Sequence, residues 1–193
     1  MILIAPTVDE VDGRSANAYA DDIALDGFVS SHTRVMAMNP EADAAFEALL
    51  SAIVPALGVR LYELVTLAAA GALRSRHCLL QHGRKTLRAG VLDEDQLARV
   101  IVDYSTAGLS DAEEVAMAYA EKLCTRSAEM TDADSQALRD AGYSDLEIVA
   151  ITMAAAARNF LSRTLQALAV PVEGVPELGP ALSAKLLDRA DRP

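Results

Sequence analysis

The stretch from Glu63 to His82 contains the residues best suited to chemistry. It holds one of the two cysteines and two of the three histidines, with a carboxylate at its start. Cys78 and His82 are four residues apart, and Ser75 precedes Cys78 by three. On a helix these three side chains share one face. A thiol, an imidazole and a hydroxyl on one stripe indicate nucleophilic or redox chemistry.

Each of these residue types has a definite role in thiol chemistry. The thiolate is the reactive form of cysteine, and a helix that begins at Ser75 would stabilise negative charge on Cys78. His82 would take the thiol proton directly or through a water molecule. A buried Glu63 would orient the imidazole and hold its charge. We therefore expect Cys78, His82 and Glu63 to form a proton relay.

Ordinary structural roles are alternatives for the same residues. Cys78 would then be a buried apolar cysteine, and Glu63 would form a salt bridge with Arg60 or Arg74. Cys124 belongs to an amphipathic pattern over residues 116–124 and is predicted to lie in the core.

Two polar neighbours of Cys78 also have two interpretations each. His77 is adjacent to the thiol but points to another face, where it is a surface imidazole or an interface contact. Ser75 is predicted to cap the helix, or else to donate a hydrogen bond to the Cys78 sulfur or to a bound peroxide. The residue types of Cys78, His77, His82 and Glu63 would also permit a metal site.

The spacing resembles the redox motif of the alkylhydroperoxidase D and carboxymuconolactone decarboxylase family. That motif is Glu, eleven residues, then Cys-x-His-Cys-x-x-x-His. Glu63, His77, Cys78 and His82 match it, whereas Ser75 stands where the first cysteine should be.

The resemblance implies an all-α fold of stacked antiparallel helices, assembly into dimers, trimers or hexamers, and no cofactor or metal. It implies a thiol-dependent peroxidase in which Cys78 attacks a hydroperoxide. Because Ser75 replaces a cysteine, an external thiol, or Cys124 if it lies close, would reduce the product. A lactone decarboxylase-like lyase that uses His82 and Glu63, or a silent ligand-binding or scaffold member, are the alternatives.

The hydrophobic pattern predicts helices and no strand. An arm over 1–14 precedes a helix from about 15 to 27, a short helix over 28–38 and a helix from Pro40 that ends by Gly58. Helices over 61–73 and 75–90 then carry the motif. Capping patterns at 93–96, 110–113, 131–134 and 144–147 begin four more, and the last helix is predicted over 180–190. We expect one domain, with its core in 15–172 and a tail over 173–193.

An internal repeat supports two similar helical halves. Residues 58–71 resemble 142–155 at an offset of 84. At this offset Ser75, Cys78 and His82 align with Asn159, Ser162 and Gln166, so the second copy lacks the thiol and the imidazole.

Composition limits the possible partners and the compartment. The chain has 193 residues, 52% hydrophobic and 4% aromatic, with a net charge of −11. This length is sufficient for one well-buried core, and the negative charge disfavours nucleic acid. The N-terminus lacks the basic residues of a signal peptide, and the longest apolar runs are about half of what spans a bilayer. We expect a cytoplasmic protein without a membrane partner.

Overall fold

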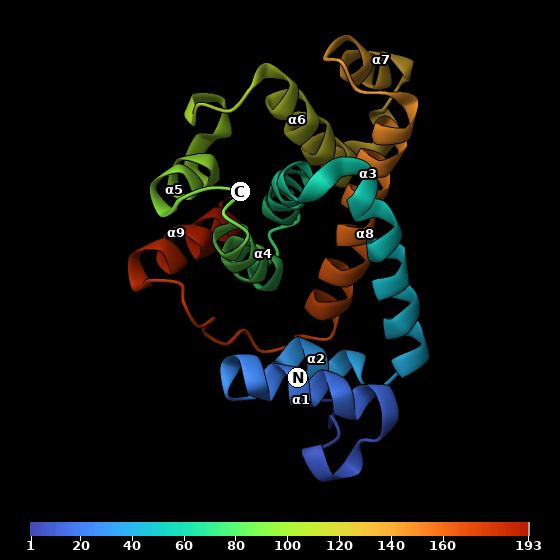
Figure 1. The fold of residues 1–193 in the computed structure, drawn as a ribbon, viewed down its shortest axis with the longest axis vertical. Coiled ribbons are helices and arrows are strands. Elements are labelled where there is room, and N and C mark those ends of the chain that lie inside the picture. The colour runs from blue at the N-terminus through green and yellow to red at the C-terminus, as the bar shows by residue number, and fades with distance from the viewer. Residues whose placement is uncertain (193) are drawn as a thin grey trace.

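The computed structural model describes residues 1–192, and in this part of the chain the regular structure is entirely helical. Figure 1 shows the arrangement. The elements in order are η1 (Val8–Glu10), α1 (Gly13–Asp26), α2 (Ser31–Met36), α3 (Pro40–Ala72), α4 (Arg76–Arg88), α5 (Glu94–Asp103), η2 (Tyr104–Thr106), α6 (Asp111–Arg126), η3 (Ser127–Glu129), α7 (Asp132–Asp140), α8 (Asp145–Ala167) and α9 (Pro180–Asp191). The predicted all-α class is therefore confirmed.

The helix boundaries follow local capping chemistry. Ser110 and Ser144 each form the predicted capping box with the glutamate three residues later, at the starts of α6 and α8. At the start of α5 only half of the predicted box forms, in which Asp93 accepts a hydrogen bond from the Gln96 backbone. Such caps satisfy backbone N–H groups that have no partner within the helix.

The helix α3 continues past Pro55 and is interrupted at Gly58, where φ is 70° and ψ is 159°. A left-handed φ is accessible to glycine at little cost because it has no Cβ atom. Gly142, its counterpart in the repeat, also has a positive φ of 101° before α8 begins. Both copies of the repeat thus start at a glycine with a positive φ.

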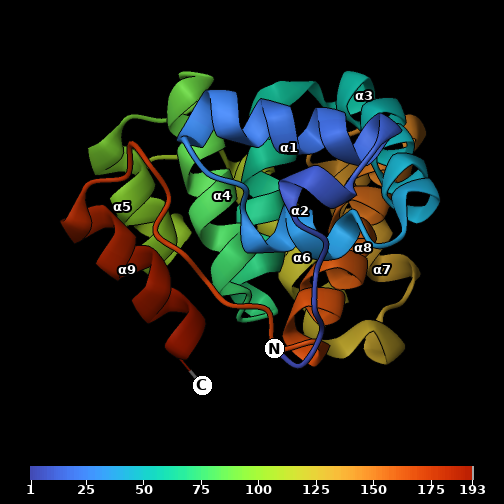
Figure 2. The ribbon, with the colours of Figure 1, turned by 90° about the horizontal axis from the view of Figure 1, so that it is seen from below.

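The second half of α3 forms the centre of the core. Its residues 62–71 are all buried, and it packs against α8, α6 and α4. Alanine-rich faces allow these helices to approach closely. In Figures 1 and 2, α5 and α9 lie beside α4, while α1 and α2 cross below α4 and α8.

By length and composition alone, α3 is long and apolar enough to span a membrane. Its interruption at Gly58 and the burial of its second half indicate a core helix instead.

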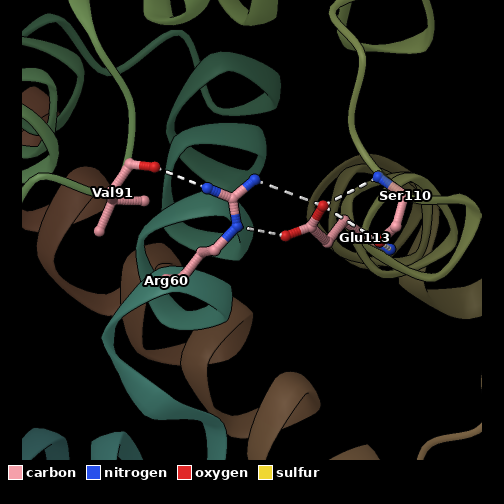
Figure 3. Close-up of polar contacts among 4 residues, drawn as sticks. All are labelled: Arg60, Val91, Ser110 and Glu113. Atoms are coloured by element: carbon pink, nitrogen blue, oxygen red, sulfur yellow. Dashed lines mark hydrogen bonds and ion pairs between the residues drawn. The ribbon is translucent and has the colours of Figure 1, made fainter.

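Arg60, just after this interruption, joins α3 to α6 and to the loop between α4 and α5. Its Nε atom lies 2.6 Å from Glu113 of α6, and its Nη1 atom donates to the Val91 carbonyl at 2.6 Å. Glu113 also accepts from the Ser110 backbone at 2.9 Å, as Figure 3 shows. The guanidinium of Arg60 is therefore bound to Glu113 and Val91.

Candidate active site

The helix α4 begins directly after a sharp break in the chain. Arg74 has a left-handed φ of 57°, and its guanidinium donates to the Ala190 carbonyl at 3.0 Å. Gln166 of α8 donates to the Leu73 carbonyl at 2.8 Å. These contacts hold the break, after which Ser75 is the N-cap residue of α4.

This break distinguishes the first copy of the repeat from the second. Arg158, the counterpart of Arg74, lies within the uninterrupted helix α8. In the first copy the new helix places Cys78 in its first turn, whereas Ser162 lies deep within α8. Helix N-termini favour negative charge, so the two copies provide different environments at equivalent positions.

The Cys78 thiol is buried and contacts α8. Its Sγ atom lies 3.3 Å from the Ser162 hydroxyl, 84 residues away. The repeat aligned these two residues with each other, and the fold brings them into contact. Contact between equivalent residues is what a two-fold axis between the copies would produce.

His82 lies one turn further along α4 and is also buried. Its Nδ1 atom lies 2.7 Å from the Glu63 carboxylate, and its Nε2 atom lies 2.9 Å from Nη1 of Arg158. A guanidinium group only donates hydrogen bonds, so Nε2 must accept and Nδ1 must carry the proton that Glu63 accepts. His82 is therefore a neutral imidazole with a defined tautomer.

The pKa of His82 agrees with this protonation state. Burial lowers it from 6.5 to about 4, although the nearby Glu63 charge raises it in part. Tyr62 contacts the imidazole with a ring-centroid distance of 6.2 Å. Burial is thus the dominant influence on the titration of His82.

The predicted pairing of Glu63 and His82 is present, but the alternative partners of Glu63 are not. Arg60 contacts Glu113, and Arg74 contacts the carbonyls of α9. The nearest polar partner of Cys78 is Ser162, while both ring nitrogens of His82 are occupied by other residues. A proton transfer from Cys78 to His82 therefore requires displacement of Arg158.

Ser75 and His77, the two polar residues just before Cys78, have different surroundings. Ser75 is buried and occupies the N-cap position, but its side chain forms no capping hydrogen bond, so the predicted cap is wrong in this respect. His77 donates from Nε2 to the Pro171 carbonyl at 2.7 Å, and its ring lies 6.4 Å from that of His32. Burial lowers the pKa of His77.

Cys124 lies in the core, as predicted. Its sulfur accepts a hydrogen bond from Asn159 at 3.2 Å. Burial raises the pKa of this thiol to about 11.

A cavity of about 210 Å³ gives access to the site. Cys78, His82, Arg158 and His77 line it, but Cys124 does not. Its apolar wall includes Phe46, Leu161 and Leu165, and α1 and α2 contribute Asp22, Leu25, His32 and Met36. Within residues 1–192, no group of three or more histidine, cysteine or carboxylate side chains is arranged to hold a metal ion.

Arg158 is the residue that sequence reasoning missed. It is only 2% exposed, and its guanidinium lies 5.4 Å above the Phe46 ring. The available signal was a single arginine directly after the alanine run over 154–157, four residues before the Ser162 that aligns with Cys78. Charged residues are rarely buried without a partner or a function.

Comparisons with known proteins agree with this fold and motif. Residues 40–122 match the carboxymuconolactone decarboxylase family. This match and the alkylhydroperoxidase D-like fold of the chain support the family that its motif resembles. A comparison with curated proteins finds no match.

Several solved structures share the fold. An uncharacterised peroxidase-related protein from Ralstonia eutropha, with the alkylhydroperoxidase D core, is 22% identical with a TM-score of 0.78, covering 91% of this chain and 92% of that one. A peroxidase-related protein from a Silicibacter species is 23% identical with a TM-score of 0.76, covering 88% and 90%. The debrominase Bmp8 is 19% identical with a TM-score of 0.76, covering 98% of both chains. These likenesses describe the fold.

Proposed function

We propose that this protein is a thiol-dependent peroxidase in which Cys78 attacks a small hydroperoxide. The observation that carries the proposal is the position of the Cys78 thiol in the first turn of α4, at a cavity that His82 and Arg158 also line. Ser162 can donate a hydrogen bond to the thiolate at this position. The peroxidase-related neighbours are consistent with the same class of reaction.

The reaction balances with a thiol as the reductant. The thiolate attacks one oxygen of the hydroperoxide, the O–O bond breaks, and the alkoxide takes a proton to leave as an alcohol. Cys78 then carries a sulfenic acid. An external thiol condenses with it and releases water, and a second external thiol restores Cys78 and leaves as a disulfide.

The buried residues around Cys78 would stabilise the charge that develops during this step. Arg158 lies one turn before Ser162 on α8, so its cation faces the same part of the cavity as the thiol. Glu63 and His82 hold Arg158 in place through the chain of hydrogen bonds at 2.7 and 2.9 Å. In this role His82 positions Arg158 and would supply a proton only after Arg158 moves.

Consumption of tert-butyl hydroperoxide in the presence of dithiothreitol or glutathione tests the proposal. Cys78→Ser should abolish the activity, whereas Cys124→Ser, the matched control, should retain it. Equal activity of wild type and Cys78→Ser would refute the proposal. Release of carbon dioxide from a carboxymuconolactone by both cysteine variants would identify the lyase alternative instead.

A further inference from the structure

Arg158 has hydrogen-bond donors that no protein group uses. Its Nη1 atom donates to His82, but its Nε and Nη2 atoms are buried and have no partner among residues 1–192. A buried donor that has lost its water and gained no acceptor is unfavourable, and more so when the group is charged. Such a cost in a well-packed helix indicates that a ligand supplies the missing acceptors.

The geometry of the unpaired donors defines the ligand group. The Nε–H and Nη2–H bonds of a guanidinium are parallel and form a planar fork that matches the two oxygens of a carboxylate. Both unpaired atoms of Arg158 belong to this fork. The imidazole of His82 separates the Glu63 carboxylate from the Arg158 guanidinium. Arg158 therefore has no direct carboxylate partner among residues 1–192.

We propose that the cavity binds a compact organic molecule through a carboxylate held by the Nε and Nη2 atoms of Arg158. This deepens the proposed function, on which its identity as a substrate rests, by naming a carboxylate-bearing hydroperoxide as the substrate class. The cavity volume of about 210 Å³ limits the ligand to a small molecule.

The helix spacing also places the reactive end of the ligand. Arg158 and Ser162 are four residues apart on α8, a rise of about 6 Å. Because Cys78 faces Ser162, the electrophilic oxygen must lie at roughly that distance from the carboxylate. Phe46, Leu161 and Leu165 would pack against the hydrocarbon between them.

The other charged groups of the cavity restrict the ligand further. Lys85 and Glu47 are exposed, and Asp22 and Asp43 are partly exposed, whereas Arg158 and Arg84 are buried. The charge of Arg84 is already paired with Asp26. Burial and the neighbouring Glu47 raise the pKa of Asp43. Three carboxyl groups nearer to solvent would disfavour a second negative charge on the ligand, so the favoured ligand is a monocarboxylate.

Binding of carboxylates to the Cys78→Ser variant tests the proposal without turnover. Butyrate, hexanoate and benzoate would each be compared with the corresponding amide by NMR titration, at constant ionic strength and pH 7. At least one carboxylate should bind ten times more tightly than its amide. If no carboxylate is preferred over its amide, the proposal is overturned.

Arg158→Lys in the same background separates the fork from charge alone. It keeps the cation but loses the bidentate geometry, so the preference for carboxylate should fall at least tenfold. Arg163→Lys, on the exposed side of α8, is the matched control and should leave the preference unchanged. An unchanged preference in Arg158→Lys would contradict the role of the fork.

These outcomes are distinct from those of the peroxidase assay. Carboxylate preference without hydroperoxide consumption by wild type would retain the binding site and refute the peroxidase function. Hydroperoxide consumption without carboxylate preference would support the peroxidase function and refute the carboxylate site.

Discussion

Arg158 donates a hydrogen bond to Nε2 of His82 at 2.9 Å, and this contact determines what the histidine can do. It fixes the protonated nitrogen as Nδ1, which faces Glu63. A second proton on His82 would have to replace the Arg158 contact. The site therefore contains a neutral histidine between a buried carboxylate and a buried cation.

The stability of the protein should fall in mild acid because of His82. Its pKa is about 4 in the folded protein and near 6.5 when unperturbed, so between these values the unfolded chain binds more protons. The contribution of His82 is fully present above about pH 6.5 and is lost as the pH falls towards 4. The expected loss from this residue is up to about 3 kcal/mol.

Urea unfolding at pH 7 and pH 4.5 would measure this loss. His82→Gln provides the comparison, since an amide has a donor and an acceptor but does not titrate near these pH values. The other ionisable groups, His32 and His77 included, are common to both proteins. A pH dependence of equal size in wild type and His82→Gln would rule out His82 as the source.

Cys78 should react with thiol reagents faster than Cys124. The pKa of Cys124 is raised to about 11 by burial, so very little of its thiolate is present at neutral pH. Cys78 lines the cavity, whereas Cys124 does not. Peptide mass spectrometry after brief iodoacetamide treatment of the native protein would compare the two, and equal or faster labelling of Cys124 would refute the assignment.

Removing the Ser162 hydroxyl should slow the reaction of Cys78. A hydroxyl that donates to a thiolate is worth about 1 kcal/mol, so Ser162→Ala should reduce the alkylation rate about fivefold. Asn159→Ala is the matched control on the same helix, because it removes the hydrogen bond to Cys124 instead. If both variants alkylate at Cys78 as fast as wild type, Ser162 does not assist the thiol.

The protein should associate with itself through an exposed apolar stripe on α8. Leu146, Val149, Met153 and Phe160 are between 48% and 68% exposed, and their spacing places them along one side of the helix. Large apolar side chains grouped at a surface commonly mark an interface. Light scattering should give a multimer at micromolar concentration, and Met153→Lys should shift the mass towards the monomer. A monomeric wild type would contradict this prediction.

Helical periodicity and local caps made much of the fold predictable from sequence. Ser110, Ser144 and Gly58 influence the backbone within a few residues of themselves, so their effects can be recognised locally. The pairing of Glu63 with His82 was predictable only with the family spacing. The repeat aligned Ser162 with Cys78, although alignment alone did not indicate contact.

The role of Arg158 depended on tertiary packing and could not be predicted in this way. Its partner His82 is 76 residues away, and no local pattern links α8 to α4. The sequence also suggested that Ser75 would cap α4, because serine favours that position. Its buried side chain forms no capping bond, which shows that preference for a position does not determine the contact.

Ser75 provides the last prediction, because it stands where the family motif has a cysteine. It occupies the N-cap position of α4, and Cys78 is the third residue of the helix. Residues three apart at a helix start project from the same side of the helix, so we expect the two side chains to face each other. Since Ser75 makes no capping bond, Ser75→Cys should cost little stability.

Wild-type protein should form no disulfide within this motif. Peroxide should leave Cys78 as a sulfenic acid or a mixed disulfide and then oxidise it to a sulfinic acid, because no cysteine lies three residues away to intercept it. In Ser75→Cys a reversible disulfide with Cys78 should form on mild oxidation and protect against this over-oxidation.

Intact and peptide mass spectrometry after graded peroxide treatment would measure both effects. Ser75→Ala is the matched control, and it should over-oxidise as wild type does because it adds no thiol. If Ser75→Cys remains a free dithiol while Cys78 still becomes a sulfinic acid, the two side chains do not face each other. The alignment of Ser75 with the first cysteine of the motif would then be wrong, and with it the inference that this chain has lost a local resolving thiol.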